Sequence, residues 1–236
     1  MKLSITEQDY LKAIFSITRI ENSTANTNAI AKHLSTKASS VTDMIKKLAA
    51  KKLVKYEKYK PVSLTALGMK KATKLIRSHR LWETFLVNRL NYDWSKVHPI
   101  AEQLEHIEDE DLMDKLDDYL GNPQWDPHGD PIPSPDGTFP QRDETILTNL
   151  NPGDSGKISS VLQDDESFLE ALNEMNICIN NTFEFIKKIN FDQSIQIRMH
   201  DKIIILSESM ASNIACLLYT SPSPRDLSTS RMPSSA

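Results

Sequence analysis

The chain of 236 residues lacks the features that mark secreted, membrane and disulfide-rich proteins. It has only two cysteines, Cys178 and Cys216, which are too few for a disulfide framework and have no partner at metal-ligand spacing. No apolar run approaches the roughly 20 residues needed to span a bilayer. The N-terminus, MKLSITEQDYLKAIF, lacks the apolar core of a signal peptide. These absences together predict a protein of the reducing cytoplasm.

The net charge of −4 conceals a strong asymmetry along the chain. Residues 1–80 carry 17 Lys+Arg against 5 Asp+Glu, a balance of +12, whereas the rest carries 11 against 27, a balance of −16. A basic N-terminal part on an acidic remainder indicates that one part meets a polyanion. The alternative is a distribution of charge that serves solubility alone.

The N-terminal part has the element order of a winged helix-turn-helix. Helices are predicted over 4–21, 26–35 and 39–52, then a two-stranded ribbon that turns near 58–61, then a long helix that Thr65 caps. An ordinary three-helix core explains the helices alone, but the ribbon and the positive charge favour DNA binding. The residues expected at DNA are side chains of the third helix and the wing: Ser39, Ser40, Thr42, Lys46, Lys47, Lys55, Lys58 and Lys60.

The remainder divides into a helical and a β-rich part. A loop rich in Gly, Pro and Asp over 121–137 indicates a boundary, and four strand candidates with one helix near 166–175 predict a small β-barrel-like domain. We therefore expect a mainly α protein. Its expected parts are a winged helix-turn-helix at 1–74, a helical metal-binding and dimerisation domain at 75–140, and a β-barrel domain at 145–215.

The segment 216–236 differs in character from the rest of the chain. CLLYTSPSPRDLSTSRMPSSA is rich in Ser and Pro and has no hydrophobic periodicity. It resembles the conceptual translation of a sequencing adapter, and a genuine disordered tail is the alternative. The expectation is that the true terminus was lost just after Ala215, which resequencing of the locus would test.

Two stretches carry histidines and carboxylates at helical spacing. His79 and Glu83 stand at i and i+4, and a second helix has four such residues at i, i+4, i+7 and i+8, so that each set shares one helical face. Such pairs are also common as solvated ion pairs on helix surfaces. With Asp9 on the first helix, three helices offer nitrogen and oxygen ligands that suit Mn²⁺, Fe²⁺, Co²⁺ or Zn²⁺. The second helix supplies His98, Glu102, Glu105 and His106.

Three motifs, HRLWE, VHPIAEQLEH and DPHGDPIP, resemble the DtxR/MntR family of metal-dependent repressors over about residues 4–135. Residues from about 147 to 215 resemble the FeoA-like β-barrel of the longer members. The resemblance implies a homodimer that binds a palindromic operator in double-stranded DNA and represses metal-transport genes. By position it implies a primary metal site of Asp9, Glu102, Glu105 and His106, and an ancillary site of His79, Glu83 and His98.

Two departures from the family pattern bear on the metal. Iron-responsive members have Met and Cys where this chain has Asp9 and Glu102, and hard oxygen ligands favour Mn²⁺ over Fe²⁺ as corepressor. Lys12 stands where some manganese regulators have a Glu ligand, and its ammonium opposes a second cation there. Manganese is therefore the favoured metal, and an iron-responsive repressor is the alternative.

Other function classes are less well supported by the sequence. A metalloenzyme is disfavoured because the chain has no HExxH and no nucleophile motif, and we expect no enzymatic activity. A winged-helix regulator that senses an organic ligand stays open, as does an activator in place of a repressor.

Overall fold

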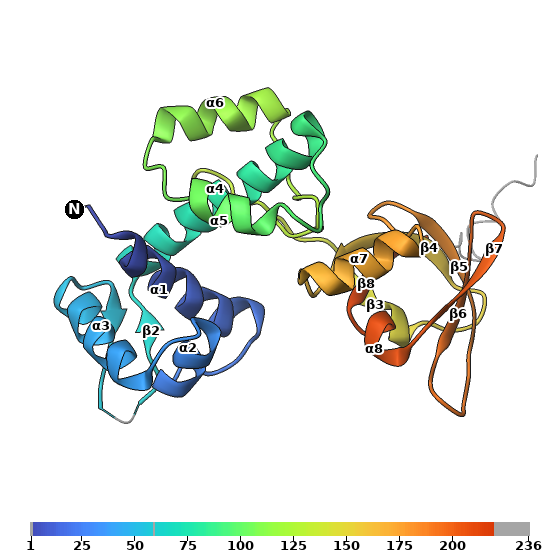
Figure 1. Cartoon of the computed structure of the whole chain (residues 1–236), viewed down its shortest axis with the longest axis horizontal. Coiled ribbons are helices and arrows are strands. Elements are labelled where there is room, and N and C mark those ends of the chain that lie inside the picture. The colour runs from blue at the N-terminus through green and yellow to red at the C-terminus, as the bar shows by residue number, and fades with distance from the viewer. Residues whose placement is uncertain (1, 59, 220–236) are drawn as a thin grey trace, which may run out of the picture. The chain divides into compact units, whose positions relative to one another are not determined.

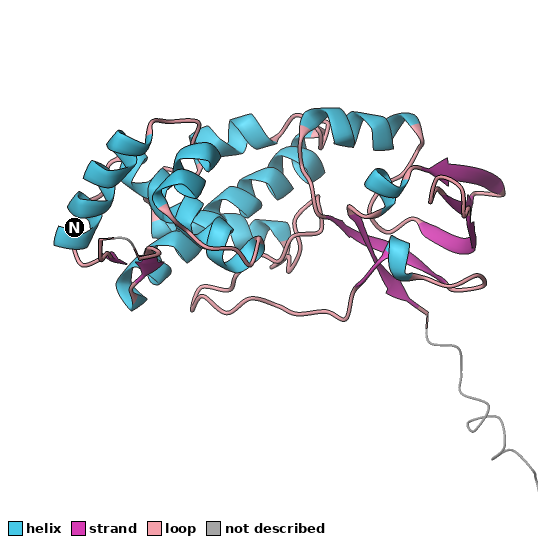
Figure 2. Cartoon of the chain, turned by 90° about the horizontal axis from the view of Figure 1, so that it is seen from below, coloured by secondary structure: helices cyan, strands magenta, loops and turns pink. Residues whose placement is uncertain are grey.

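The computed structural model describes residues 2–58 and 60–219. The chain divides into two compact units, Met1–Gln141 and Arg142–Ala236. The first unit is helical apart from a short two-stranded ribbon, and the second is built on a sheet (Figures 1 and 2). The predicted fold class is therefore confirmed: a helical winged helix-turn-helix and a helical domain, followed by a small β domain.

The winged helix-turn-helix folds around one apolar core. Its helices are α1 (Ile5–Phe15), α2 (Thr27–His33) and α3 (Ala38–Ala50), and its wing pairs β1 (Val54–Lys55) with β2 (Ser63–Leu64). Side chains three and four residues apart point to the same side of each helix, which is why the apolar positions of the sequence form the core. Fully buried residues of this core are Leu11, Ile14, Ile30, Val41, Ile45, Leu48 and Leu53.

The first predicted helix is divided in two. α1 ends at Phe15, and the π-helix η1 (Ser16–Ile20) follows, closed by a hydrogen bond from the Glu21 amide to the Ser16 carbonyl. The Thr18 hydroxyl donates to the Ile14 carbonyl at 2.7 Å. A Ser or Thr hydroxyl that bonds back in this way competes with the regular ladder and bends a helix. Hydrophobic spacing alone does not reveal this change of pitch.

A glycine fixes the long helix α4 (Ala66–Leu90) against Leu53, the residue just before β1 of the wing. A Cβ on Gly68 would lie 1.9 Å from the Leu53 carbonyl oxygen, so only glycine fits at this position. The Thr65 hydroxyl donates to the Lys52 carbonyl at 2.7 Å and accepts the Gly68 amide. These contacts fix the start of α4 relative to the DNA-binding part. Because α4 continues into the metal-binding part, it connects the two parts rigidly.

α4 also forms the spine of the second helical layer. α5 (His98–Leu104) and α6 (Glu110–Leu120) pack along it, as Figure 1 shows. The loop 121–137 lies in the C-terminal part of the first unit, which ends at Gln141. Arg80 on α4 holds this loop by donating to the Pro131 carbonyl at 2.5 Å and to Asp130 at 2.8 Å.

The second unit is a six-stranded antiparallel sheet in the order β3-β8-β4-β5-β6-β7. Within the described residues β3 and β7 do not pair, so the expected β-barrel is an open sheet. Its helices are α7 (Glu166–Glu174) and the short α8 (Glu208–Ala211), with the 3-10 turn η2 (Leu147–Asn149). The strands are β3 (Thr145–Ile146), β4 (Ser155–Val161), β5 (Thr182–Lys188), β6 (Ile195–Met199), β7 (Lys202–Leu206) and β8 (Ile214–Leu218).

The last strand crosses the boundary expected after Ala215. Cys216, Leu217 and Leu218 belong to β8 and pair with β4, and Cys216 is fully buried. These three residues are part of the sheet, while residues 220–236 of the expected tail lie outside the described residues. No helix in the described ranges is long and apolar enough to cross a membrane.

Glu7 joins α1 to α3 and gives a prediction for acid stability. Its carboxylate caps the Ser4 amide and accepts hydrogen bonds from Lys51 at 2.5 Å and Lys47 at 3.1 Å. Burial alone would raise its pKa, but the Lys51, Ser4 and Lys47 contacts outweigh burial and lower the pKa to about 2. The stabilisation is therefore present above about pH 4.5 and is lost as the pH falls towards 2.

We predict that Glu7→Gln lowers the free energy of unfolding at pH 7 by about 1.5–3 kcal/mol, the range for a lost hydrogen bond to a charged group. Urea titrations followed by circular dichroism at pH 7, 4.5 and 3 would measure this loss. The difference between wild type and variant should shrink with falling pH, and a difference that stays constant would contradict the assignment.

Candidate metal centre

Three helical segments of the first unit bring the ligand-type side chains together. α1 presents Asp9 one turn after the N-cap, and α4 presents His79 and Glu83 one turn apart. α5 starts at His98 and ends at Leu104, so Glu105 and His106 follow the helix rather than belong to it. The four residues expected on one helical face therefore have different neighbours. His98 and Glu102 lie beside His79, whereas His106 lies beside Asp9.

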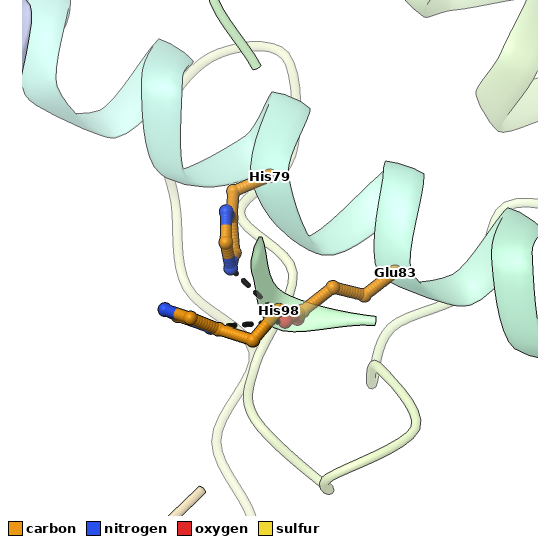
Figure 3. A group of neighbouring side chains, drawn as sticks. All are labelled: His79, Glu83 and His98. Atoms are coloured by element: carbon orange, nitrogen blue, oxygen red, sulfur yellow. Dashed lines mark hydrogen bonds and ion pairs between the residues drawn. The ribbon is translucent and has the colours of Figure 1, made fainter. Parts of the chain in front are cut away.

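One group consists of His79, Glu83 and His98 (Figure 3). Glu83 Oε1 lies 3.0 Å from His79 Nε2 and 3.3 Å from His98 Nδ1, and the two rings meet edge to face. Glu83 is 2% exposed. Two imidazoles around one buried carboxylate form a donor set that suits a divalent transition metal.

The protonation of this group follows from its mutual contacts. Burial works against the charged forms of both Glu83 and His79, but their attraction and hydrogen bonds outweigh it. The pKa of Glu83 is lowered well below its usual value, and the pKa of His79 is raised by Glu83 and Glu105. The group therefore holds an ionised carboxylate ready for a cation, and a metal that binds there must displace the proton of an imidazole.

A second group joins Asp9 to Glu105 and His106. His106 Nε2 lies 3.3 Å from Asp9 Oδ1 and 4.0 Å from Glu105 Oε1. Glu105 is 3% exposed, and its Oε1 accepts no hydrogen bond from any described residue. A buried carboxylate oxygen without a partner is costly, and a cation between these three residues would satisfy it. The residues present therefore fit a metal ion.

Gln8 orients the imidazole of this second group. His106 Nδ1 lies 2.6 Å from Gln8 Oε1, and Gln8 Nε2 donates to Glu108 Oε1 at 2.5 Å. Because the amide nitrogen is used by Glu108, its oxygen faces His106 and accepts the Nδ1 proton. The lone pair of His106 is then on Nε2, which faces Asp9. Sequence analysis did not identify Gln8, since a glutamine is not itself a typical ligand.

Glu102 takes a different position from the one expected. It lies with His79 and Glu105 in a third group, and its Oε1 is 3.4 Å from His98 Nε2. A hydrogen bond from His98 is the main reason why the pKa of Glu102 is lowered. The structure thus brings all seven expected ligand residues into one region, but joins Glu102 to the histidines of α4 and α5 rather than to Asp9 and His106.

Two residues of the loop 121–137 complete the surroundings of Glu83. His128 Nδ1 lies 3.7 Å from Glu83 Oε2, and its Nε2 donates to the Trp94 carbonyl at 2.9 Å. Burial lowers the pKa of His128, but Glu83 and Asp126 outweigh it and raise the pKa to about 10, whereas burial and Asp130 raise the pKa of Asp126 to about 7. The sequence indicated a structural or surface role for His128, because no second ligand type stands at helical spacing from it.

The residues expected at DNA lie on α3 and the wing. Thr42 is half-buried, and its hydroxyl donates to the Ala38 carbonyl. The other seven residues expected at DNA are exposed. Lys46 pairs with Asp43, Lys47 with Glu7 and Lys60 with Glu57. The exposed ones are Ser39, Ser40, Lys46, Lys47, Lys55, Lys58 and Lys60. The pairs of Lys46 and Lys60 are exposed on both sides, and weak surface pairs of this kind exchange readily for phosphate, whereas Lys47 pairs with the buried carboxylate of Glu7.

Comparison with known proteins shows the family. The N-terminal DNA binding domain of iron dependent repressors matches residues 2–62, their metal binding and dimerisation domain residues 65–134, and the FeoA domain residues 145–217. A manganese-dependent transcriptional repressor in complex with manganese superposes with a TM-score of 0.80 and 33% identity, over 90% of this chain and 100% of that one. The chain belongs to the iron-dependent repressor family.

Two curated proteins are similar to this chain over different shares of their length. The iron-dependent repressor IdeR of Mycobacterium leprae is 27% identical over 187 residues, which is 74% of this chain and 81% of that protein. A probable metal transport system membrane protein of Chlamydia trachomatis is 44% identical over 71 residues, and the chain spans only 16% of its length. The predicted resemblance to metal-dependent DNA-binding repressors with a FeoA domain is confirmed.

The contact between Gln8 and His106 gives a prediction for metal affinity. Gln8→Leu keeps the size of the buried side chain but removes the acceptor for the Nδ1 proton. We expect Mn²⁺ affinity at the Asp9 group to fall by about 10–100-fold, the usual effect of losing such a support. Gln8→Glu keeps an acceptor oxygen but loses the hydrogen bond that Gln8 Nε2 donates to Glu108, so it should retain more of the affinity than Gln8→Leu. Isothermal titration calorimetry would compare them, and equal affinity in wild type and Gln8→Leu would refute the role.

Proposed function

We propose that the chain is a repressor of metal-uptake genes that binds a palindromic operator as a homodimer when it is loaded with Mn²⁺, with Fe²⁺ as the alternative corepressor. The observation that carries the proposal is the buried Oε1 of Glu105, which accepts no hydrogen bond from any described residue and faces His106 and the Asp9 of the DNA-binding part. The family supports metal dependence, DNA binding and dimerisation.

The donor atoms support manganese. The groups around Glu83 and Glu105 contain carboxylate oxygens and imidazole nitrogens only. Of the two cysteines, Cys178 is exposed in the second unit and Cys216 is buried in β8, so neither belongs to these groups. Hard oxygen donors suit Mn²⁺ better than they suit softer competitors, although Fe²⁺ accepts the same set.

The mechanism depends on joining α1 to the chain that follows α5. When bound, the metal supplies positive charge and directional bonds to carboxylates that would otherwise repel one another. Asp9 belongs to α1, while Glu105 and His106 follow α5, so these side chains hold the DNA-binding helices at one position on the metal-binding part. Glu7 connects α1 to α3 through its ion pairs with Lys47 and Lys51, so the position of α3 depends on that of α1. In a dimer, that position sets the spacing of the two recognition helices.

A cavity gives the second candidate function some support. The first unit contains a cavity of about 300 Å³ between α1, α4 and α6, lined by apolar side chains such as Leu11, Leu75 and Met113 and equally by charged ones such as Lys74, Arg77 and Glu105. This is the lower end of the volumes of small-molecule sites. A regulator that senses an organic ligand through this cavity is therefore the alternative to metal sensing.

We predict that the full chain selects one palindromic site from a pool of random duplex DNA only when Mn²⁺ is present. The selection would be run in parallel with EDTA, with Mn²⁺ and with anaerobic Fe²⁺. Enrichment with Fe²⁺ but not with Mn²⁺ would show that Fe²⁺ is the corepressor. Equal enrichment in EDTA would refute metal activation and favour the organic ligand.

Two variants test the site itself. Glu105→Ala and His106→Ala should each abolish metal-dependent DNA binding, because each removes a ligand from the Asp9 group, while the melting temperature in EDTA shows whether the chain still folds. Glu174→Ala removes an exposed carboxylate of α7 and serves as the matched control. A full metal response in both site variants, measured by fluorescence anisotropy with labelled operator, would show that the site lies elsewhere.

A further inference from the structure

Lys12 reaches into the middle of the candidate ligands. Its ammonium nitrogen lies 2.7 Å from Glu102 Oε1, 2.6 Å from Glu105 Oε2 and 3.2 Å from His79 Nδ1. The side chain is 17% exposed, and the Glu105 carboxylate that it contacts is fully buried. The residues around the ammonium form the third ligand-type group of this region, and a cation already lies at its centre.

The two oxygens of Glu105 therefore face different partners. Oε2 is bound by Lys12 and lies 2.5 Å from His79 Nδ1, whereas Oε1 accepts no hydrogen bond from any described residue and faces His106 at 4.0 Å. A divalent ion on the Oε1 side meets only ligands. One on the Oε2 side would meet the ammonium at the distance of a direct contact, where like charges repel strongly in a poorly solvated site.

We propose that Lys12 is a tethered cation, which permanently fills the position between His79, Glu102 and Glu105 and thereby excludes a metal ion from it. The inference rests on the proposed function, since it concerns how many ions the metal-binding region takes. The chain binds one ion fewer than its ligand-type side chains could hold.

The tether has a second consequence for the metal-free protein. Lys12 belongs to α1, and its partners Glu102 and Glu105 lie on and just after α5. Two charged hydrogen bonds thus connect the DNA-binding helices to the metal-binding part without any metal. The ammonium also neutralises carboxylates that would repel one another. The metal-free chain is therefore already partly assembled, and the ion on the Oε1 side completes the connection.

Three substitutions at this position test the proposal. Lys12→Glu replaces the cation by a further oxygen ligand, Lys12→Gln removes the charge at similar length, and Lys12→Arg keeps the charge as the matched control. The purified full-length chains would be dialysed to equilibrium against Mn²⁺, and the bound ions per chain counted by mass spectrometry of the metal. We expect one more ion per chain in Lys12→Glu and Lys12→Gln than in wild type, and no gain in Lys12→Arg.

A second readout is the melting temperature, which is measured first without metal and then with Mn²⁺. In EDTA, the melting temperature of Lys12→Gln should lie a few degrees below that of wild type, because two carboxylates lose their cation. Saturating Mn²⁺ should close this gap, since an ion takes the place of the ammonium. The two readouts are independent, so a variant that folds poorly in EDTA can still be counted with metal.

The outcomes separate this inference from the proposed function. The proposal that Lys12 excludes a metal ion would be overturned if neither Lys12→Glu nor Lys12→Gln bound more ions per chain than wild type, whatever number wild type binds. A wild-type chain that binds no Mn²⁺, and whose DNA affinity is the same in EDTA and Mn²⁺, would overturn the proposed function. In that case a gain of one ion in the variants would still support the exclusion by Lys12.

Discussion

The buried carboxylate of Glu105 is the constraint on which the rest of the site depends. A carboxylate away from water needs a partner for each of its oxygens, because a buried polar atom without one is costly. Lys12 and His79 supply partners on one side, and the other side is left to a cation between Asp9 and His106.

α1 connects the two tasks of the first unit. One of its positions, Glu7, is tied to Lys47 and Lys51 of α3, which is the helix expected at DNA. The positions that follow, Asp9 and Lys12, face the ligand-type residues of α4 and the end of α5. A change in how α1 is held is therefore passed to the recognition helix through ion pairs and a shared core, without any contact between metal and DNA.

Much of the fold follows from local patterns. Ser4, Asn26 and Thr65 are N-caps where the sequence predicted helix starts, and the wing pairs Val54 with Leu64 as its alternating residues indicated. One departure is the π-helix after Phe15, which accompanies a hydroxyl that bonds back to the helix. Hydrophobic spacing does not register such a hydrogen bond. Whether a sheet closes into a barrel depends on its edge strands, which hydrophobic alternation does not show.

For the site, the sequence by itself determined which chemistry is present. Histidines and carboxylates one helical turn apart share a face by helical geometry, and the absence of cysteine near them limits the donors to nitrogen and oxygen. Only the tertiary structure decided how these donors are divided. Glu102 joins His79 rather than Asp9, Gln8 orients His106, and the Lys12 ammonium occupies one of the positions. The contacts of Gln8 and Lys12 join residues that are 67 to 98 positions apart in the sequence. Such distances are set by how helices pack against one another, which the spacing of residues along one helix does not specify.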